Sequence, residues 1–530
     1  MRSMSSIKNA TASFLKNLIN IIIGVVAQAI FIKTLGNEYL GISGLFSNII
    51  SMLAIAELGI GSSVIYHLYE PVAKNDKEQI KSLLKFYKKS YRVIALIVLI
   101  IGFLILPFIK YIVGQINIKH SIYLIYILFL INAVASYLLS YKRSILIANQ
   151  KNYVIDIIHI LCIICLNFFQ ILVLFLTKNY IIYLIIKLLF TIIENIFITI
   201  VANRMYPYIK EKNILRLDSE IKNDVFKKIK GLIFHNIGGF IVLGSDNIII
   251  SKFLGIVTVG LYSNYCLILN AVSNLLNQIF DSIVANIGNL LIEKNSEKSY
   301  SVYKSLLMID SWIYSYASAS ILCVIEPFIT VWVGKEYILP KLVLIILVIN
   351  FYIQGMRQTC NSFKVAAGIF YEDRYIPLIE SVLNIVFSII FLKFFGLAGV
   401  FMGTIASTML LFLYSYPKYV YINLFSKSYY EYIKENLYHI LIAIISIVPT
   451  YIITSKLYIN NMYLKIIINL VIAFIIPNLI YYFLMNNTND FKYTIEILSK
   501  NDKIKKILRI FNFRKNLVKK SGKWYNIFVI

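Results

Sequence analysis

Long apolar segments constrain the fold of this chain more than any other feature of its sequence. Mostly apolar runs of around 20 residues or more recur along the 530 residues, of which 59% are hydrophobic and only 15% charged. A helix of about 20 apolar residues spans the hydrocarbon core of a bilayer, whereas the strands of a membrane barrel alternate apolar and polar residues. The sequence therefore predicts an all-α polytopic membrane protein.

We expect about fourteen transmembrane helices, which form two six-helix lobes followed by two C-terminal helices. The first apolar run begins near Ala10 and is too long for a signal-peptide core, so we count it as a span. The predicted spans are residues 10–34, 39–67, 91–113, 120–141, 152–177, 179–202, 231–254, 258–285, 304–332, 340–366, 375–395, 397–423, 434–455 and 462–486. The predicted domains are an N-terminal lobe (1–206), a cytoplasmic linker (207–230), a C-terminal lobe (231–425), a two-helix extension (426–488) and a basic tail (489–530).

The placement of lysine and arginine indicates how the spans are oriented. If the N-terminus is cytoplasmic, the inner segments hold 40 of the 52 Lys and Arg residues and the outer loops and ends hold 10. Cytoplasmic segments of membrane proteins carry such an excess, so we expect both termini on the cytoplasmic side of a bacterial cell membrane. The net charge of +26 then follows from topology and implies no nucleic-acid partner. The basic tail is either an amphipathic helix on the anionic inner leaflet or a solvated segment.

A short motif near the start of the chain recurs near its middle. Residues 33–36 (KTLG) and 44–48 (GLFSN) are repeated as residues 252–255 (KFLG) and 260–264 (GLYSN), at offsets of 219 and 216. A weaker copy, KFFGLAG, occupies residues 393–399. Each copy joins an odd-numbered predicted helix to the next one on the outer side. The two lobes therefore share one orientation, as in transporters built from parallel repeats.

Polar residues follow one face of at least two predicted spans. The set at residues 340–366 has steps of four, three, four and three, which align side chains on one side of a helix. Its members are Asn350, Gln354, Arg357, Asn361 and Lys364. A second set comprises Asn270, Asn274, Asn277 and Asp281. Ionisable groups in hydrocarbon cost about 2.5–3.5 kcal/mol each, so they normally face protein or water, and this pattern is typical of a transporter with a polar cavity.

Two extended motifs connect this chain to a known family. They are YLGISGLFSNIISMLAIAELGIG at residues 39–61 with LYEP at 68–71, and SDNIIISKFLG at 245–255 with VGLYSN at 259–264. Both resemble the polysaccharide flippases of the O-antigen and capsule type, in the multidrug/oligosaccharidyl-lipid/polysaccharide exporter superfamily. The resemblance extends over residues 5 to about 486. It implies a two-lobed, fourteen-helix fold with a central V-shaped cavity, and transfer of undecaprenyl-diphosphate-linked oligosaccharide from the inner to the outer leaflet.

The headgroup of such a substrate needs fixed positive charge for its diphosphate and hydrogen-bonding groups for its sugars. We predict that Arg357, with Lys187 as a second cation, holds the diphosphate. The residues expected to contact sugar hydroxyls are Asn350, Gln354, Asn361, Asn20, Gln28, Asn274 and Asn277. Structural alternatives stay open. Arg357 could instead pair with a carboxylate such as Asp246 or Glu380, and asparagines could join neighbouring helices with bonds worth about 0.6 kcal/mol.

Acidic residues within or beside the spans are candidates for coupling transport to protons or sodium, or for gating. They are Glu57, Glu194, Asp246 and Asp281. A static ion pair is the alternative for Glu194, because Lys187 lies seven residues earlier on the same helix face. We expect no other cofactor and no metal centre, and we interpret the five cysteines, all in apolar segments, as core residues.

We expect a transporter without enzymatic activity that acts as a monomer, associated with proteins of polysaccharide assembly. The alternative within the same fold is a cation-coupled exporter of drugs or other small molecules, for which twelve helices are typical. A polymerase or ligase for lipid-linked sugars usually has a large outer loop, whereas the outer loops predicted here are short. A non-transporting scaffold would not need polar stripes on several spans.

Overall fold

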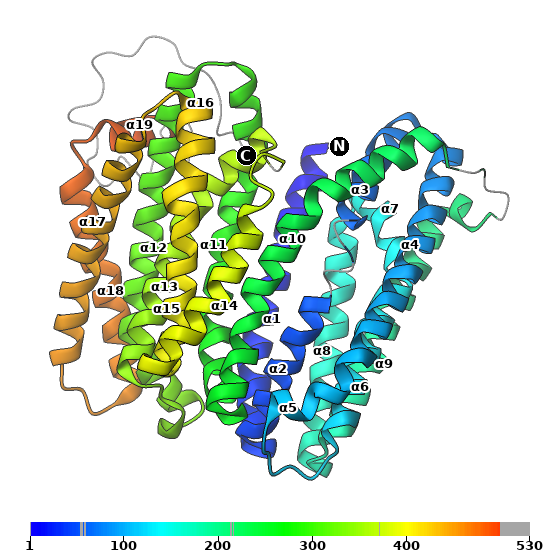
Figure 1. Cartoon of the computed structure of the whole chain (residues 1–530), viewed down its shortest axis with the longest axis horizontal. Helices are drawn as coiled ribbons and strands as arrows, with labels where there is room; N and C mark the ends of the chain where they lie inside the picture. The colour runs from blue at the N-terminus through cyan, green and yellow to red at the C-terminus, as the bar shows by residue number, and fades with distance from the viewer. Residues whose placement is uncertain are drawn as a thin grey trace. The chain divides into compact units, whose positions relative to one another are not determined.

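The computed structural model describes residues 2–53, 57, 60–211, 215, 217–369 and 371–498, and these residues contain helices and no β-strand. They pack as two compact units (Figure 1). The first unit comprises residues 1–268 and 370–407, and the second comprises residues 269–369 and the described residues from 408 onward. The predicted boundaries of the lobes, linker and extension stay predictions. The basic part of the predicted tail, residues 499–530, lies outside the described residues.

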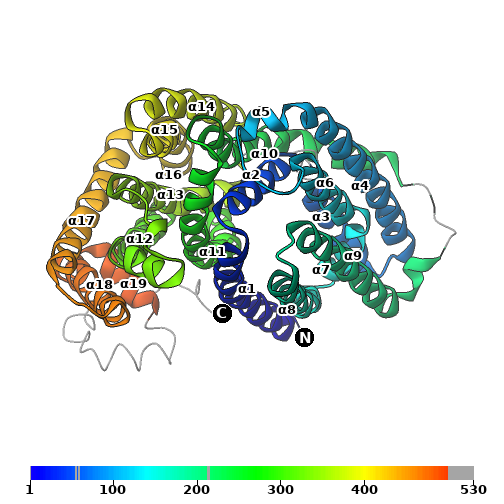
Figure 2. The same cartoon turned by 90° about the horizontal axis from the view of Figure 1, so that it is seen from below.

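The first unit contains the N-terminal helices and one later hairpin. Its helices are α1 (Arg2–Leu35), α2 (Asn37–Leu53), α3 (Ile60–Lys74), α4 (Lys77–Ile105), α5 (Ile109–Val113), α6 (Ile122–Leu138), α7 (Arg143–Ala148), α8 (Asn152–Thr177), α9 (Tyr180–Met205), α10 (Ser219–Leu254), the start of α11 (Ile256–Ile292), α14 (Ile376–Phe395) and most of α15 (Leu397–Leu410). Within this unit α1 packs on α8, α8 on α9, α9 on α6 and α6 on α4, as the end-on view in Figure 2 shows. Helix α10 packs on α2 and α14.

The second unit is built around α12. It contains the rest of α11, α12 (Ser296–Trp332), α13 (Lys341–Ala367), the segment after α15, α16 (Asn423–Phe425), α17 (Tyr429–Lys456), α18 (Met462–Met485) and α19 (Asn489–Leu498). Helix α12 packs on α13, α17 and α18. The Tyr481 hydroxyl joins α18 to α12, because it lies 2.6 Å from Ser311 Oγ and 2.8 Å from Ser315 Oγ. Hydroxyls thus satisfy one another inside the core of this unit.

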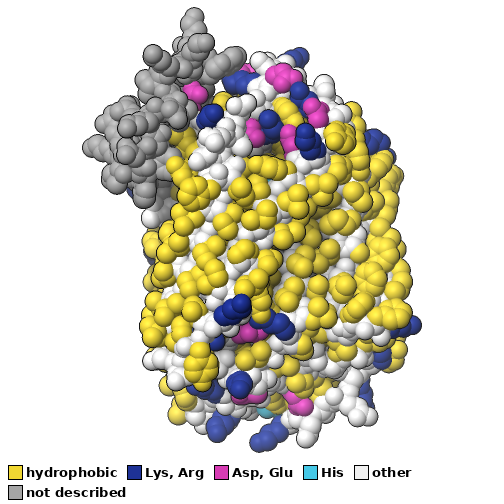
Figure 3. All heavy atoms as spheres, turned by 90° about the vertical axis from the view of Figure 1, so that its left-hand side faces the viewer, with side chains coloured by type: hydrophobic (Ala, Val, Ile, Leu, Met, Phe, Trp, Pro, Cys, Tyr) yellow, Lys and Arg dark blue, Asp and Glu magenta, His cyan; other side chains and the backbone are white. Residues whose placement is uncertain are grey.

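Apolar side chains cover the outer face of the second unit. Leu441, Ile445 and Val448 on α17 and Val471 and Phe474 on α18 are all exposed. Figure 3 shows hydrophobic side chains over the middle of this face and Lys and Arg side chains gathered toward its two ends. A soluble protein rarely exposes an apolar surface of this extent, whereas lipid covers such a surface without cost. The chain is a multi-pass membrane protein.

Within the described chain, thirteen helices are long and apolar enough to cross a membrane. Each of them overlaps a predicted span. The predicted continuous span over residues 39–67 is wrong in detail, since this segment forms the shorter helices α2 and α3. The sequence between them contains Gly59, a residue type that weakens a helix, and Glu57, whose carboxylate accepts a short hydrogen bond from the Tyr91 hydroxyl of α4. Glu57, the described residue between the two helices, is therefore tied to α4.

The repeated motif forms two matching corners that pack against each other. Gly36 between α1 and α2 has φ +85°, and Gly255 between α10 and α11 has φ +88°, a backbone conformation that favours glycine. A Cβ at Gly41 would overlap the carbonyl oxygen of Ile256, and a Cβ at Gly260 would overlap that of Asn37. The two contacts are equivalent, because Gly41 and Gly260, and likewise Asn37 and Ile256, are 219 residues apart. Gly260 therefore corresponds in the structure to Gly41, and not to Gly44 as the sequence motif suggests. Both corners lie at one end of the first unit, as a parallel repeat requires.

Candidate functional site

The predicted stripe on α13 lies on one helix face and is joined by hydrogen bonds. Gln354 Nε2 donates to Asn350 Oδ1 at 3.4 Å, and Arg357 Nη1 donates to Gln354 Oε1 at 2.6 Å. These three side chains and Asn361 are half-buried, while Lys364 is buried. The structure therefore confirms that the stripe shares one face.

The α13 stripe faces the irregular helical segment that continues α15. The Tyr416 hydroxyl accepts from Arg357 Nε at 3.1 Å and donates to Asn361 Oδ1 at 3.0 Å. Lys364 Nζ donates to Ser415 Oγ at 3.3 Å. Residues Leu411–Ser415 and Pro417–Ile422 form wide π-type turns, which often occur at functional sites because they reorient side chains. Here they surround Tyr416, the residue that bonds both Arg357 and Asn361.

The predicted polar set on α11 is more open than the α13 stripe. Asn270, Asn274 and Asp281 are exposed, and only Asn277 is tied to a neighbouring helix, since its Oδ1 accepts from the Tyr314 hydroxyl at 2.9 Å. Exposed polar side chains on a membrane-length helix need water or a polar ligand.

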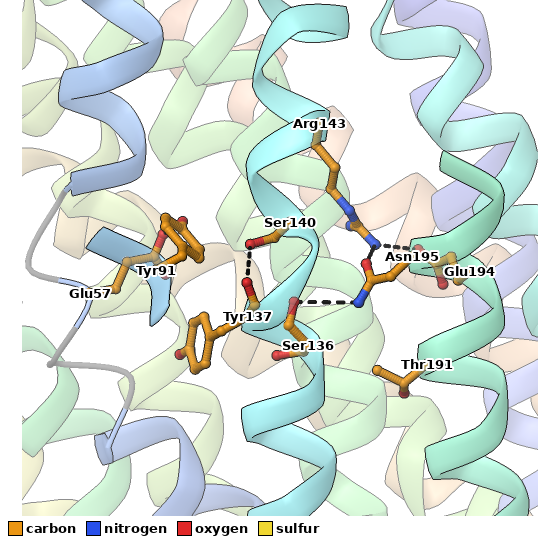
Figure 4. Close-up of a pocket in the computed structure, with 9 residues that line it drawn as sticks. All are labelled: Glu57, Tyr91, Ser136, Tyr137, Ser140, Arg143, Thr191, Glu194 and Asn195. Atoms are coloured by element: carbon orange, nitrogen blue, oxygen red, sulfur yellow. Dashed lines mark hydrogen bonds and ion pairs between the residues drawn. The ribbon is translucent and has the colours of Figure 1, made fainter. Parts of the chain in front are cut away.

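The first unit contains a cavity of about 330 Å³ lined by polar and aromatic side chains (Figure 4). Glu57 and Tyr91 form one wall, and Ser136, Tyr137 and Ser140, at the end of α6 and just after it, form a second. The remaining lining residues are Arg143 of α7 and Thr191, Glu194 and Asn195 of α9. Two predicted coupling residues, Glu57 and Glu194, thus come together at one cavity.

Arg143 is a residue of this cavity that the sequence analysis did not select. Its Nη2 lies 2.8 Å from Glu194 Oε1 and 3.0 Å from Asn195 Oδ1 (Figure 4). The other carboxylate oxygen of Glu194 lies 3.2 Å from His159 Nδ1. Arg143 lies just after a predicted span and was counted with the basic residues of a cytoplasmic segment. It was therefore not considered as a residue of a site within the membrane. A basic residue within a turn of a span end is the signal that could have identified it.

Lys187 does not pair with Glu194. Within the described chain the partners of Glu194 are Arg143 and His159, and the Lys187 ammonium lies 5.2 Å from the centre of the Phe129 ring. Lys187 is one helix turn from the cavity, because Thr191 Oγ1 donates to its carbonyl oxygen at 3.0 Å.

The predicted contacts on α1 serve two different purposes. Gln28 Nε2 donates to Asn264 Oδ1 of α11 at 2.6 Å, which ties α1 to the second corner. Asn20 Oδ1 is buried and has no hydrogen-bond partner among the described residues. Lys16 and Ser13 both bond the buried carboxylate of Asp156 at 2.6 Å, an ion pair that the sequence analysis missed.

Asp246 belongs to a polar cluster between α10, α14 and α15. Its Oδ2 accepts from Thr404 Oγ1 at 3.4 Å, and Thr404 accepts from Asn384 Nδ2 at 3.0 Å. Asn384 Oδ1 accepts from Ser245 Oγ at 2.9 Å. The other carboxylate oxygen of Asp246 is buried and makes no hydrogen bond within the described residues. Such an oxygen is costly to bury, so it is a candidate for binding a cation or a proton.

Comparison with known proteins identifies the family. A family model described as polysaccharide biosynthesis protein matches residues 6–284, just over half of the chain. The chain belongs to this family. No curated protein matches it. The motifs at residues 39–61 and 245–264 lie within the matched region, and the family resemblance that they predict is confirmed.

Solved structures confirm the fold class. The chain is similar to the lipid II flippase MurJ in an inward closed conformation, with a TM-score of 0.60, 17% identity, and coverage of 90% of this chain and 98% of that one. An inward-facing MATE-family multidrug transporter gives a TM-score of 0.57 at 16% identity and covers 74% of this chain and 91% of its own. A variant of the Vibrio cholerae MATE transporter VcmN gives a TM-score of 0.54 at 14% identity, and the match covers 80% of this chain and 99% of that one. The fold is that of the superfamily to which these transporters belong.

Proposed function

We propose that this protein moves an undecaprenyl-diphosphate-linked oligosaccharide from the inner to the outer leaflet of a bacterial cell membrane, for synthesis of a surface polysaccharide. Family membership and the flippase fold support a lipid-linked substrate. The observation that carries the proposal is the α13 stripe, which holds Arg357 and Lys364 among amide and hydroxyl groups on a membrane-spanning helix. A headgroup with a diphosphate and sugars requires this combination of cations and hydrogen-bonding groups.

The chemistry at Arg357 is exchange of one set of hydrogen bonds for another. The guanidinium now bonds Gln354 and Tyr416, and a diphosphate would take up these donors in a bidentate arrangement. Gln354, Asn350 and Asn361 would then be released to contact sugar hydroxyls. Each group is satisfied before the substrate binds and after it binds, so no unpaired charge is exposed to hydrocarbon.

A complementation experiment tests this proposal. The gene would be expressed in a bacterial strain that lacks its polysaccharide flippase, and surface polysaccharide and membrane levels of the protein would be measured. We expect restoration by the wild type, loss with Arg357→Ala and partial function with Arg357→Lys. Arg374→Ala is the matched control, because Arg374 lies in a loop against Tyr371 and Tyr375. Wild-type polysaccharide with Arg357→Ala at normal protein levels would disprove the role of Arg357.

Transport without covalent change is part of the proposal. In proteoliposomes, the lipid-linked oligosaccharide should be recovered chemically unchanged after it has changed leaflets. The same vesicles loaded with a cationic drug test the alternative of a small-molecule exporter. Drug export without lipid transfer would favour that alternative and refute the flippase proposal.

We further propose that transport is coupled to H⁺ or Na⁺ through Asp246, whose buried carboxylate oxygen is available as a ligand. Asp246→Asn should abolish the response of transport to an imposed ion gradient. Asp281→Asn is the comparison, because this predicted site is exposed. Equal transport with proton and sodium gradients both collapsed would exclude coupling. We expect both termini on the cytoplasmic side and a monomer that contacts polysaccharide-assembly proteins, and reporter fusions at each terminus test the orientation.

A further inference from the structure

The cavity of the first unit has a composition that suits an uncharged ligand. Two carboxylates, Glu57 and Glu194, and one guanidinium, Arg143, line it, together with three hydroxyl-bearing residues, two tyrosines and one asparagine. None of the residues that line it is aliphatic. A diphosphate or a uronic acid would meet the carboxylate of Glu57, which no second cation among the lining residues balances, and this is unfavourable in a low-dielectric surrounding. The guanidinium does not reverse this, because Glu194 already balances its charge at 2.8 Å.

The hydrogen-bonding groups that remain available in the cavity are mixed donors and acceptors. The single proton of the Thr191 hydroxyl is directed to Asn132 Oδ1 at 2.8 Å and to the Lys187 carbonyl at 3.0 Å, and the Ser136 hydroxyl donates to the Ala133 carbonyl at 2.7 Å. The oxygen lone pairs of both hydroxyls remain as acceptors. The Tyr137 hydroxyl makes no hydrogen bond to another described residue and is available as a donor. A ligand that matches such a set must itself both donate and accept, as the hydroxyls of a sugar do.

The size and the aromatic wall of the cavity match a single sugar ring. Its volume of about 330 Å³ equals that of roughly ten water molecules, which is too small for a whole oligosaccharide. The ring centroids of Tyr91 and Tyr137 are 5.9 Å apart and the ring planes are tilted by 58° to one another. Aromatic faces give apolar area with fixed geometry, against which the C–H face of a pyranose packs.

We infer that this cavity binds one uncharged pyranose residue of the transported headgroup and thereby contributes to selection of the glycan. The inference rests on the proposed function, and it assigns to the first unit a role in sugar recognition that is distinct from the phosphate-binding role of the α13 stripe. Glu57 and Glu194 then act as acceptors for sugar hydroxyls, with Arg143 holding Glu194 in position.

Saturation-transfer NMR on the full-length protein in lipid nanodiscs tests the inference, because this method detects weak sugar binding. The probes are glucose, galactose and N-acetylglucosamine as neutral sugars, and glucuronic acid as an anionic one. We expect at least one neutral sugar to bind, and glucuronic acid to bind at least about fivefold more weakly. Thr191→Val should weaken the binding about fivefold through loss of one hydrogen bond, and Glu57→Gln at least about tenfold.

The matched control is Thr199→Val. Thr199 lies two turns further along α9, is half-buried like Thr191 and bonds the carbonyl oxygen four residues earlier in the same way, but it does not line the cavity. The Thr199→Val variant should bind the neutral sugars as well as the wild-type protein does. Ser136→Ala provides a second cavity variant if Thr191→Val does not fold.

Three results would overturn the inference: no neutral sugar binds above empty nanodiscs, binding persists unchanged in the cavity variants, or glucuronic acid binds as well as the neutral sugars. Complementation by the wild-type chain is scored separately. If polysaccharide is restored but no sugar binds, only the proposal that the cavity binds sugar is rejected. If sugar binds but polysaccharide is not restored, only the proposed flippase function is rejected.

Discussion

Each unit of the molecule places an arginine inside a membrane-spanning region, and the two arginines have different surroundings. Arg143 bonds Glu194 and Asn195 in a cavity that contains two carboxylates. Arg357 donates to the uncharged side chains of Gln354 and Tyr416, and Lys364 lies seven residues later on the same helix face. The charge of a guanidinium therefore does not define its ligand. The neighbouring side chains on the same surface decide whether an anion or a neutral molecule is favoured.

Inorganic pyrophosphate provides the most direct test of this comparison. Arg357→Ala should lower the affinity of the purified protein for pyrophosphate by about fiftyfold, because a charge-assisted hydrogen bond contributes about 1.5–3 kcal/mol. Arg143→Ala should change the affinity for pyrophosphate by less than about twofold, because the carboxylates beside Arg143 already repel an anion. Isothermal titration calorimetry in nanodiscs measures both values. Similar losses for the two variants would show that the units do not differ in ligand charge.

Removal of the carboxylate partner of Arg143 should affect stability. Glu194→Gln should lower the free energy of unfolding by about 2 kcal/mol, below the 3–5 kcal/mol found for fully buried pairs, because 34% of the Arg143 side chain is exposed. The double variant Arg143→Met with Glu194→Gln should recover part of this loss. Thermal unfolding in detergent measures the series. A double variant no more stable than Glu194→Gln alone would show that the ion pair is not the source of the effect.

Two tyrosine hydroxyls give a smaller and well-matched contrast between the units. Tyr416→Phe removes the bonds to Arg357 and Asn361 and should cost about 1 kcal/mol in the free energy of unfolding. Tyr137→Phe should cost less than about 0.5 kcal/mol, since its hydroxyl bonds no described residue. The same unfolding measurement applies. Equal costs would mean that the Tyr137 hydroxyl has a partner in solution, and would weaken its assignment as a free donor.

Periodic patterns could be predicted from the sequence, and contacts between distant segments could not. The α13 stripe follows from helical spacing alone, and the structure places its members as expected. The bond from Tyr91 of α4 to Glu57, between α2 and α3, joins residues 34 positions apart, so no local pattern reveals it. A static ion pair with Lys187 on the same helix face is the alternative that spacing offers for Glu194, whereas in the structure Glu194 pairs with Arg143 of another helix. The spacing of residues along one helix gives no information about ion-pair partners that come from other helices.

The residues missed by the sequence analysis share a location. Arg143 follows the predicted span 120–141, and Lys16 and Asp156 lie six and four residues after the starts of the predicted spans 10–34 and 152–177. Basic residues near span ends also determine the orientation of a membrane protein. Because orientation alone explained these residues, the sequence analysis did not predict their contacts inside the unit. A charged residue within one turn of a span end has enough side-chain length to reach the interior.

The reciprocal glycine contact has a mechanical consequence. Gly41 and Gly260 each leave room for a backbone carbonyl of the other copy, so the junction of α1 with α2 and that of α10 with α11 share one interface. A side chain at either glycine would push the two junctions apart. One substitution would therefore disturb two segments that lie 219 residues apart in the sequence.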